Sequence, residues 1–271
     1  MPLAPPVTIA VFPASLGMTS LRLATFMPAL VASVHVLQDR HHKEVAGRHK
    51  LVLGPAEGRT REARSTIKGD QFMPRDTADR LAIRDLIENW VLWRDARMWD
   101  RFRTVWHKDG QMWATWFQGS YEDFIRVSQE GYDRGVRIMH MLGGMSIDIK
   151  GKRAIAQTKM TISQRAKVEG VLCDVVCSGR FYDFLEKRKG RWGIVLRRLA
   201  YEKDRIDPVE PDAKLTLDKT HLAQFPEGYR HLAYLQSKIG YKIKDELPGL
   251  DGPPLAALYA KGEAWLKGKK L

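Results

Sequence analysis

The sequence RIMHMLGGMSIDI (Arg137–Ile149) opens the part of the chain that decides the fold. It reads as an extended segment, and Lys150–Gly151 after it is suited to a hairpin turn. Three more extended segments follow, with another tight turn at Lys189–Gly190: AIAQTKMTISQ (Ala154–Gln164), VLCDVVCSGRFYDFLEK (Val171–Lys187) and WGIVLRRLAY (Trp192–Tyr201). Consecutive strands joined by short turns predict an antiparallel sheet.

Helical patterns precede these strands. Asp76 or Thr77 can cap a helix whose apolar residues recur every three or four positions, at Ala78, Ala82, Leu86, Trp90 and Trp93. A short second helix is expected to carry Trp99, Phe102, Val105 and Trp106. A turn at Asp109–Gly110, a strand over Met112–Phe117 and a helix over Tyr121–Tyr132 follow. Helices followed by a run of strands predict an α+β domain with helices packed against one face of a curved antiparallel sheet.

The chain divides into three expected segments. Residues 1–72 contain no acidic residue before Asp39 and are dominated early by prolines and small residues, which predicts a disordered leader. Residues 73–210 form the α+β domain. Residues 211–271 form a helical C-terminal extension, with helical patterns at Gly228–Gly240 and Leu255–Lys267. We expect the extension to pack on the domain or on a neighbouring subunit.

Composition argues against several classes of protein. The net charge of +13 is spread along the chain without a basic block or a reading motif, so we expect no nucleic-acid partner. No apolar run is long enough for a membrane-spanning helix. Cys173 and Cys177 would lie roughly 13 Å apart on one strand, which is too far for a disulfide. No histidine cluster accompanies them to bind a metal. We therefore expect two buried thiols in a reducing cytoplasm, and no metal site.

Four short motifs occur in a characteristic order: RDARMWD (Arg94–Asp100), IMHMLG (Ile138–Gly143), GRFYD (Gly179–Asp183) and GRW (Gly190–Trp192). In this order and spacing, the chain resembles the SnoaL-like branch of the nuclear transport factor 2-like superfamily. Within that branch it is most similar to scytalone dehydratase and hexachlorocyclohexane dehydrochlorinase. The resemblance implies a cone-shaped curved antiparallel sheet with helices packed on its concave side, and a conical pocket floored by the sheet and walled by the helices.

The resemblance also implies a site and a function. In lyases of this group, an Asp at the end of the first helix pairs with a His on the second strand, and these positions fall on Asp95 and His140. The dehydrochlorinase also uses an Arg before the last hairpin turn, which falls on Arg188. The implied function is that of a lyase or isomerase that needs no cofactor and acts on a small hydrophobic cyclic molecule. Relatives commonly form dimers or trimers.

These residue types suit proton abstraction next to a leaving group. A histidine titrates near neutral pH and is a natural base. A carboxylate bonded to its far nitrogen fixes the tautomer and stabilises the imidazolium. The departing hydroxide or halide needs a positive group, which Arg188 could supply. We expect an apolar substrate wall at Trp93, Met112, Trp113 and Trp116, suited to a flat hydrophobic molecule.

Each residue also has a plainer interpretation. Asp95 could cap the second helix or pair with Arg97, and His140 could be an interior histidine without a chemical role. Arg188 could belong to a solvated hairpin edge, and each tryptophan could be ordinary core. His107 is expected at the surface.

The sequence departs from the relatives near the carboxylate. Scytalone dehydratase has a tyrosine there, whereas this chain has Trp90, Trp93 and Arg94. Gly143–Gly144 is expected to place a bulge in the strand of the histidine. These differences leave the substrate and the reaction open. The alternative function is a non-catalytic module that binds a small molecule or assembles subunits.

Overall fold

The computed structural model describes residues 76–271, so the expected leader over residues 1–72 lies outside the described part. The chain begins with helices α2 (Thr77–Asp95) and α3 (Trp99–Arg103), strands β1 (Trp106–Trp113) and β2 (Gln118–Ser120), and helix α4 (Tyr121–Asp133). Four long strands follow: β3 (Arg137–Lys150), β4 (Arg153–Val168), β5 (Val171–Arg188) and β6 (Arg191–Pro208). The C-terminal part contains α5 (Lys219–Leu222), a 3₁₀ turn (Glu227–Tyr229), α6 (Arg230–Lys238) and α7 (Pro253–Leu266). The α+β fold class is confirmed.

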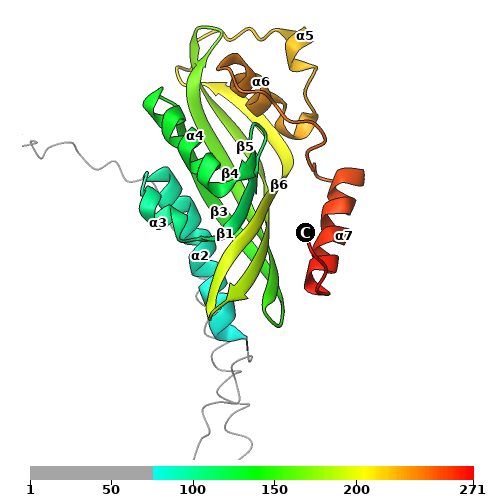
Figure 1. Ribbon diagram of the computed structural model, residues 1–271. Coiled ribbons are helices and arrows are strands. Elements are labelled where there is room, and N and C mark those ends of the chain that lie inside the picture. Colours follow the sequence, from blue (N-terminus) through cyan, green and yellow to red (C-terminus); the bar gives the residue numbers. More distant parts are fainter. Residues whose placement is uncertain (1–75) are drawn as a thin grey trace, which may run out of the picture. The chain divides into compact units, whose positions relative to one another are not determined.

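The six strands form one sheet in the order β2-β1-β6-β5-β4-β3 (Figure 1). Strands β3 to β6 pair antiparallel through successive hairpins, as the sequence predicts. The expectation of a wholly antiparallel sheet is wrong at one pair, because β1 runs parallel to β6. In the chain, α4 and four strands (β2 to β5) separate β1 from β6, so no hairpin turn sets their relative direction.

Strand β1 begins earlier than the sequence suggests. Val105 and Trp106 were expected in the second helix, but α3 ends at Arg103 and the strand starts at Trp106. The Asp109–Gly110 pair lies inside β1, where the register with β6 is irregular. A Cβ at Gly110 would come within 2.9 Å of the His107 carbonyl oxygen. The glycine is therefore needed for close backbone approach inside a strand, and the expected turn at this position is wrong.

Helix α2 exists as predicted, but a different stripe faces the core. Ile83, Ile87 and Trp90 are fully buried, whereas Ala78 and Ala82 are exposed. The larger apolar side chains occupy the interior because they remove more apolar surface from water than alanine does. The stripe continues to Arg94, which is also buried. The end of α2 therefore brings a charged group into the interior.

The two faces of the sheet are covered by different helices. Helices α2, α3 and α4 lie against one face, and α6 lies over the same region near the far ends of β4 to β6 (Figure 1). Helix α7 lies on the other side, where Leu258 and Trp265 pack with Phe184 and Leu196. Residues from the C-terminal extension therefore contribute to both layers, and α6 contributes to the interior described below.

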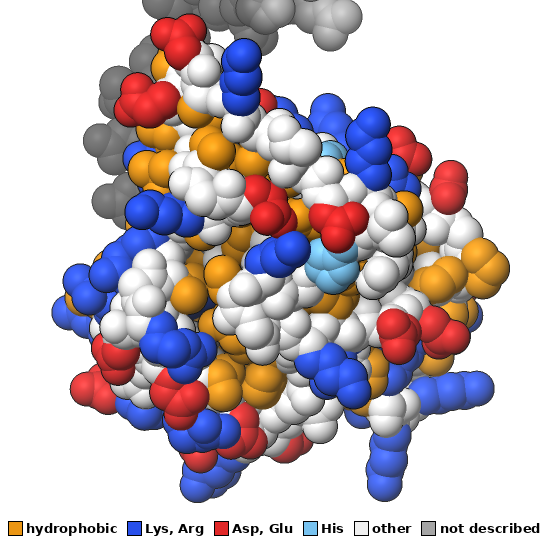
Figure 2. All heavy atoms as spheres, turned by 90° about the horizontal axis from the view of Figure 1, so that it is seen from above, with side chains coloured by type: hydrophobic (Ala, Val, Ile, Leu, Met, Phe, Trp, Pro, Cys, Tyr) orange, Lys and Arg blue, Asp and Glu red, His pale blue; other side chains and the backbone are white. Residues whose placement is uncertain are grey.

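The surface shows no concentration of basic side chains on the face drawn in Figure 2. Lys and Arg side chains there are interspersed with acidic and uncharged groups. Within residues 76–271, no helix is both long and apolar enough to cross a lipid bilayer. Cys173 and Cys177 are buried free thiols on β5.

Candidate functional site

Asp95 and His140 meet inside the domain although 45 residues separate them in the chain. Asp95 is the last residue of α2, and His140 lies on β3 opposite Ile162 of β4. One carboxylate oxygen of Asp95 accepts a hydrogen bond from the backbone N–H of His140 at 2.5 Å. The other lies 2.9 Å from the ring Nδ1. One carboxylate thus fixes both the backbone and the ring of the same histidine.

The local backbone explains why Asp95 is free to make these bonds. The chain leaves α2 through Arg97, whose φ of 60° lies in the left-handed region. The cap residue of α3 is Met98, and no side chain caps that helix. Asp95 therefore neither caps the second helix nor pairs with Arg97, and the plainer interpretations of this residue are wrong. Its carboxylate points to β3 instead.

The bulge predicted after His140 is present. The pairing of β3 with β4 shifts between Leu142 and Met145, across Gly143–Gly144. His140 precedes this shift and stays in regular register with β4. The ladder therefore holds the backbone of His140 from one side while Asp95 holds its N–H and ring from the other.

Burial and hydrogen bonding set the charge state of the pair. The His140 side chain is 6% exposed. Burial is the largest influence and lowers the pKa of His140, while the hydrogen bond to Asp95 opposes that shift in part. For Asp95, burial acts to raise the pKa, but the hydrogen bonds from His140 and the positive charge of Arg94 outweigh it, and the net shift is downward. At neutral pH the pair is therefore a neutral imidazole beside an ionised carboxylate.

This charge state defines the chemistry available. The carboxylate only accepts hydrogen bonds, so the proton of the neutral imidazole lies on Nδ1. Nε2 then carries the lone pair, and it has no hydrogen-bond partner among the described residues. A neutral imidazole with a free Nε2 at a cavity wall is the form required of a general base.

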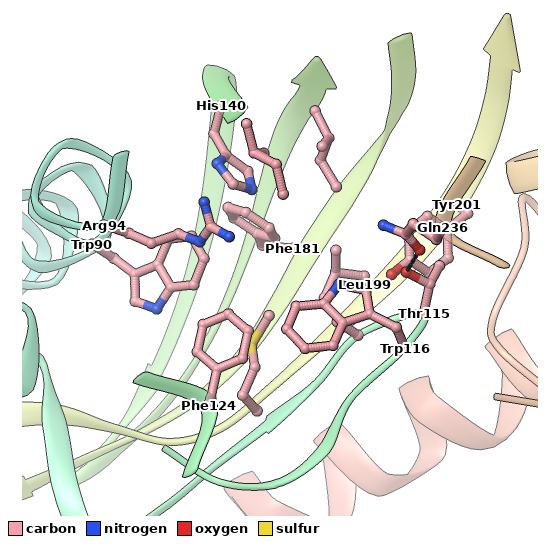
Figure 3. A pocket seen from close by; sticks show the side chains of 14 residues that line it. Trp90, Arg94, Thr115, Trp116, Phe124, His140, Phe181, Leu199, Tyr201 and Gln236 are labelled. Atoms are coloured by element: carbon pink, nitrogen blue, oxygen red, sulfur yellow. Dashed lines mark hydrogen bonds between the residues drawn. The ribbon is translucent and has the colours of Figure 1, made fainter. Parts of the chain in front are cut away.

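Arg94 is a site residue that sequence reasoning missed. Its guanidinium is buried, with Nη1 3.2 Å from Asp95 and 3.4 Å from the Tyr132 hydroxyl. Its Nε has no hydrogen-bond partner among the described residues. Figure 3 shows the guanidinium beside the His140 ring. An arginine that follows an apolar helical stripe at four-residue spacing was the available signal, since Trp90 and Arg94 lie on one face.

The pair opens on a mostly apolar cavity (Figure 3). Its wall includes two of the four residues expected there, Met112 and Trp116, together with Trp90, Phe124 and Phe181. The cavity is narrow, with a volume of about 30 Å³. That volume leaves room for roughly one or two waters. Side chains at the wall must therefore move to admit a ring.

Trp93 and Trp113 lie elsewhere. Trp93 lines a shallow surface groove with Asn89 and Trp192, outside the cavity. Trp113 packs with the α7 cluster on the opposite face of the sheet, where Arg198 lies 4.7 Å from its ring centroid. Trp113 is the last residue of β1, and Trp93 lies in the last turn of α2.

The structure does not bring Arg188 to His140. Arg188 ends β5, and its guanidinium donates to both oxygens of Asp109 and to Glu186. It lies in a surface hollow beside His107 rather than among the cavity residues. His107, expected at the surface, is buried, and its Nε2 lies 2.8 Å from the Glu186 carbonyl oxygen. The positive group nearest the pair is therefore Arg94.

Three polar residues at the other side of the cavity were also missed. Thr115, Tyr201 and Gln236 line it and are almost fully buried. Gln236 comes from α6, which the sequence assigns to the C-terminal extension. Their sequence contexts carry no motif, so only the fold brings them together. Within residues 76–271, no group of three His, Cys, Asp or Glu side chains is arranged to hold a metal ion.

The chain is similar to a known domain family, to fungal proteins and to solved structures. Residues 75–198 match the family described as the SnoaL-like domain. The chain is 37% identical over 204 residues to a PEP2-like protein of Fusarium vanettenii, covering 71% of this chain and 88% of that protein. It is 36% identical to Pea pathogenicity protein 2 of the same fungus, with the same coverage. A solved hexachlorocyclohexane dehydrochlorinase is 15% identical with a TM-score of 0.42, covering 52% of this chain and 95% of that one. That last likeness is too distant to bear on activity.

Proposed function

Because this chain belongs to the SnoaL-like domain family and buries a histidine–carboxylate pair in an apolar cavity, we propose that it is a lyase or isomerase. It would act without a cofactor on a small hydrophobic cyclic molecule. The observation that carries the proposal is the double hold of Asp95 on His140, at 2.5 Å to the backbone N–H and 2.9 Å to Nδ1. That hold directs a basic Nε2 to the cavity.

In the proposed elimination, Nε2 of His140 removes a proton from a ring carbon. The electron pair of the C–H bond forms the new double bond, and the neighbouring substituent leaves with its own pair. Asp95 stabilises the imidazolium that forms. If the leaving group is hydroxide, the imidazolium returns the proton and water departs; a halide leaves as the anion, and the imidazolium then releases its proton to water. In an isomerisation the proton returns to another carbon of the same molecule.

Arg94 is the group we propose to stabilise the developing negative charge. Its buried guanidinium carries an unpartnered Nε beside the pair, whereas Arg188 is held by Asp109 and Glu186 away from the cavity. A positive group in a site that excludes water acts more strongly on charge than one in solvent. Arg94 therefore takes the role that the sequence suggested for Arg188.

A module without catalysis, which binds a small molecule or assembles subunits, is the second candidate. His140 packs edge-on against the Trp90 ring, with centroids 5.5 Å apart, as an interior histidine would. In this function the pair would serve to orient a bound ligand. The two candidates differ in one outcome, which is turnover of a molecule that binds.

The test begins with a thermal-stabilisation screen of cyclic alcohols, cyclic halides and polyketide-like compounds. Each compound that binds is then followed by NMR for elimination or double-bond migration. We expect turnover by the natural chain and by Arg188→Gln, and turnover lower by about 10²–10⁴-fold in His140→Ala and in Asp95→Asn, with unchanged circular dichroism. Full activity in either pair variant would end the proposal. Binding without turnover by the natural chain would support the module.

A further inference from the structure

The cavity has a second polar end, formed by Thr115, Tyr201 and Gln236. Thr115 lies between β1 and β2, Tyr201 on β6 and Gln236 on α6, and their exposed fractions are 1%, 1% and 3%. Figure 3 shows His140 and Arg94 on one side of the cavity and these three residues on the other. The apolar walls lie between the two polar ends.

The hydrogen bonds at this end leave two donors unused. The Thr115 hydroxyl donates to Oε1 of Gln236 at 2.6 Å. This bond directs the amide nitrogen of Gln236 to the cavity, as Figure 3 shows. The Tyr201 hydroxyl is buried and makes no hydrogen bond of ordinary geometry with the described residues, although Thr115 lies close enough to act on it. Since a buried polar group without a partner destabilises a fold, a ligand that supplies the partner gains affinity.

The unused groups favour a neutral acceptor. Burial is the largest influence and raises the pKa of Tyr201; Thr115 acts in the opposite direction without reversing the shift, so the hydroxyl keeps its proton and can donate. The amide of Gln236 also donates without carrying charge. Among the cavity residues at this end, none is charged. A neutral carbonyl oxygen matches two such donors, whereas a carboxylate would be buried without a counter-charge.

The fold holds this end in place through α6. Asp204 accepts hydrogen bonds from the Leu232 backbone N–H and the His231 ring, each at 2.8 Å, and so fixes the first turn of the helix to β6. At Gly228 a Cβ would come within 2.6 Å of the Tyr201 carbonyl oxygen, so only a glycine allows this approach. Gln236 therefore reaches the cavity from a helix anchored on the strand that carries Tyr201.

We propose that Tyr201 and Gln236 form a carbonyl-binding subsite, and that the substrate class is a small cyclic ketone whose oxygen is bound there while its ring faces His140. Thr115 is a positioning residue that orients the Gln236 amide. The inference deepens the proposed function by naming a substrate class. Both subsite residues lie beyond residues 75–198, the part matched to the family.

The test measures ketone preference rather than turnover, so it stands apart from the catalytic proposal. The probes are cyclohexanone and methylenecyclohexane, which share a ring and differ by an oxygen in place of a CH₂ group. Dissociation constants come from ligand-detected NMR titrations of the full chain. One hydrogen bond corresponds to a preference of roughly 2- to 12-fold. We expect cyclohexanone to bind the natural chain more tightly by that factor.

Substitutions at the two ends of the cavity show which residues cause the preference for cyclohexanone. Tyr201→Phe and Gln236→Met should each reduce it toward equal affinity, while the affinity for methylenecyclohexane changes little. His140→Gln is the matched control at the opposite end and should keep the preference, even if it removes all turnover. A preference that persists in the Tyr201→Phe/Gln236→Met double variant overturns the proposal. Equal affinities in the natural chain, including no detectable binding of either probe, overturn it as well.

Discussion

Replacing Asp95 with asparagine tests the pair with the smallest change of shape. Asp95 accepts two hydrogen bonds from His140, at 2.5 Å from the backbone N–H and 2.9 Å from Nδ1. An asparagine offers one accepting oxygen and one donating NH₂ group. If the oxygen faces the backbone, the NH₂ group faces Nδ1 and the imidazole proton moves to Nε2. If the oxygen faces the ring, two donors face each other at the backbone.

The size of the effect follows from this geometry. In the first orientation Nε2 carries a proton and no longer acts as a base, so we expect the rate to fall by about 10²–10⁴-fold. In the second, a backbone donor is left without an acceptor, at a cost of about 1–3 kcal/mol in the free energy of unfolding. Arg94 also loses its carboxylate partner, which adds to the loss of stability because its charge is buried.

Nitrogen-15 NMR of the histidine rings shows directly which ring nitrogen carries the proton. We expect His140 in the natural chain to show a protonated Nδ1, and Asp95→Asn to show a protonated Nε2 or a clear loss of stability in urea. The pKa of His140 should also fall further in the variant, because the hydrogen bond to the Asp95 carboxylate acts to raise that pKa. His231, bonded through Nδ1 to Asp204, is an internal reference that should not change. An unchanged His140 tautomer with unchanged stability would refute the reasoning.

Three other predictions concern pH and packing. Because the pKa of His140 is lowered from 6.5, turnover should stay level from pH 8 to about 6.5 and then fall with a midpoint below 6.5. The free energy of unfolding should also decrease as the pH drops below 6.5, because the unfolded chain then binds more protons than the folded chain. A midpoint above 6.5 would contradict this. Tyr201→Phe should raise the free energy of unfolding in urea by about 1 kcal/mol, since its hydroxyl is unpaired. Tyr234→Phe, which loses a hydrogen bond from the Asp218 N–H, should lower the free energy of unfolding. A lower free energy of unfolding in both variants would contradict the argument. Asp204→Ala should cost about 1–3 kcal/mol by leaving the Leu232 N–H without its acceptor, and an unchanged urea midpoint would show that α6 needs no such anchor.

The sequence was most informative where local chemistry dictates structure. The hairpin turns at Lys150–Gly151 and Lys189–Gly190 lie where expected, and both glycines have positive φ. The bulge at Gly143–Gly144 follows from glycine in a strand. Errors arose where several local solutions compete: Asp109–Gly110 is a common turn sequence, yet here it is part of a strand paired with β6.

The candidate site likewise contains residues that were predicted from the sequence and one that was predicted wrongly. The family resemblance carried by the motif order implied an acidic residue at the end of the first helix and a histidine on a strand, and the structure brings Asp95 and His140 within hydrogen-bond distance. The same motifs suggested Arg188, but the position of a side chain at a strand end depends on its partners. Asp109, on a different strand, binds this guanidinium at the surface.

By itself, the sequence determined the first helix and the four hairpin strands, because spacing and turn chemistry are local properties, and its resemblance to a known family indicated the two residues of the pair. Tertiary structure alone decided which polar groups share the cavity. Arg94 is buried because helix rotation places it behind Trp90, and Gln236 reaches the cavity because Asp204 fixes α6 to β6. Contacts between segments far apart in the chain leave no periodic pattern in it, since each depends on how whole elements pack.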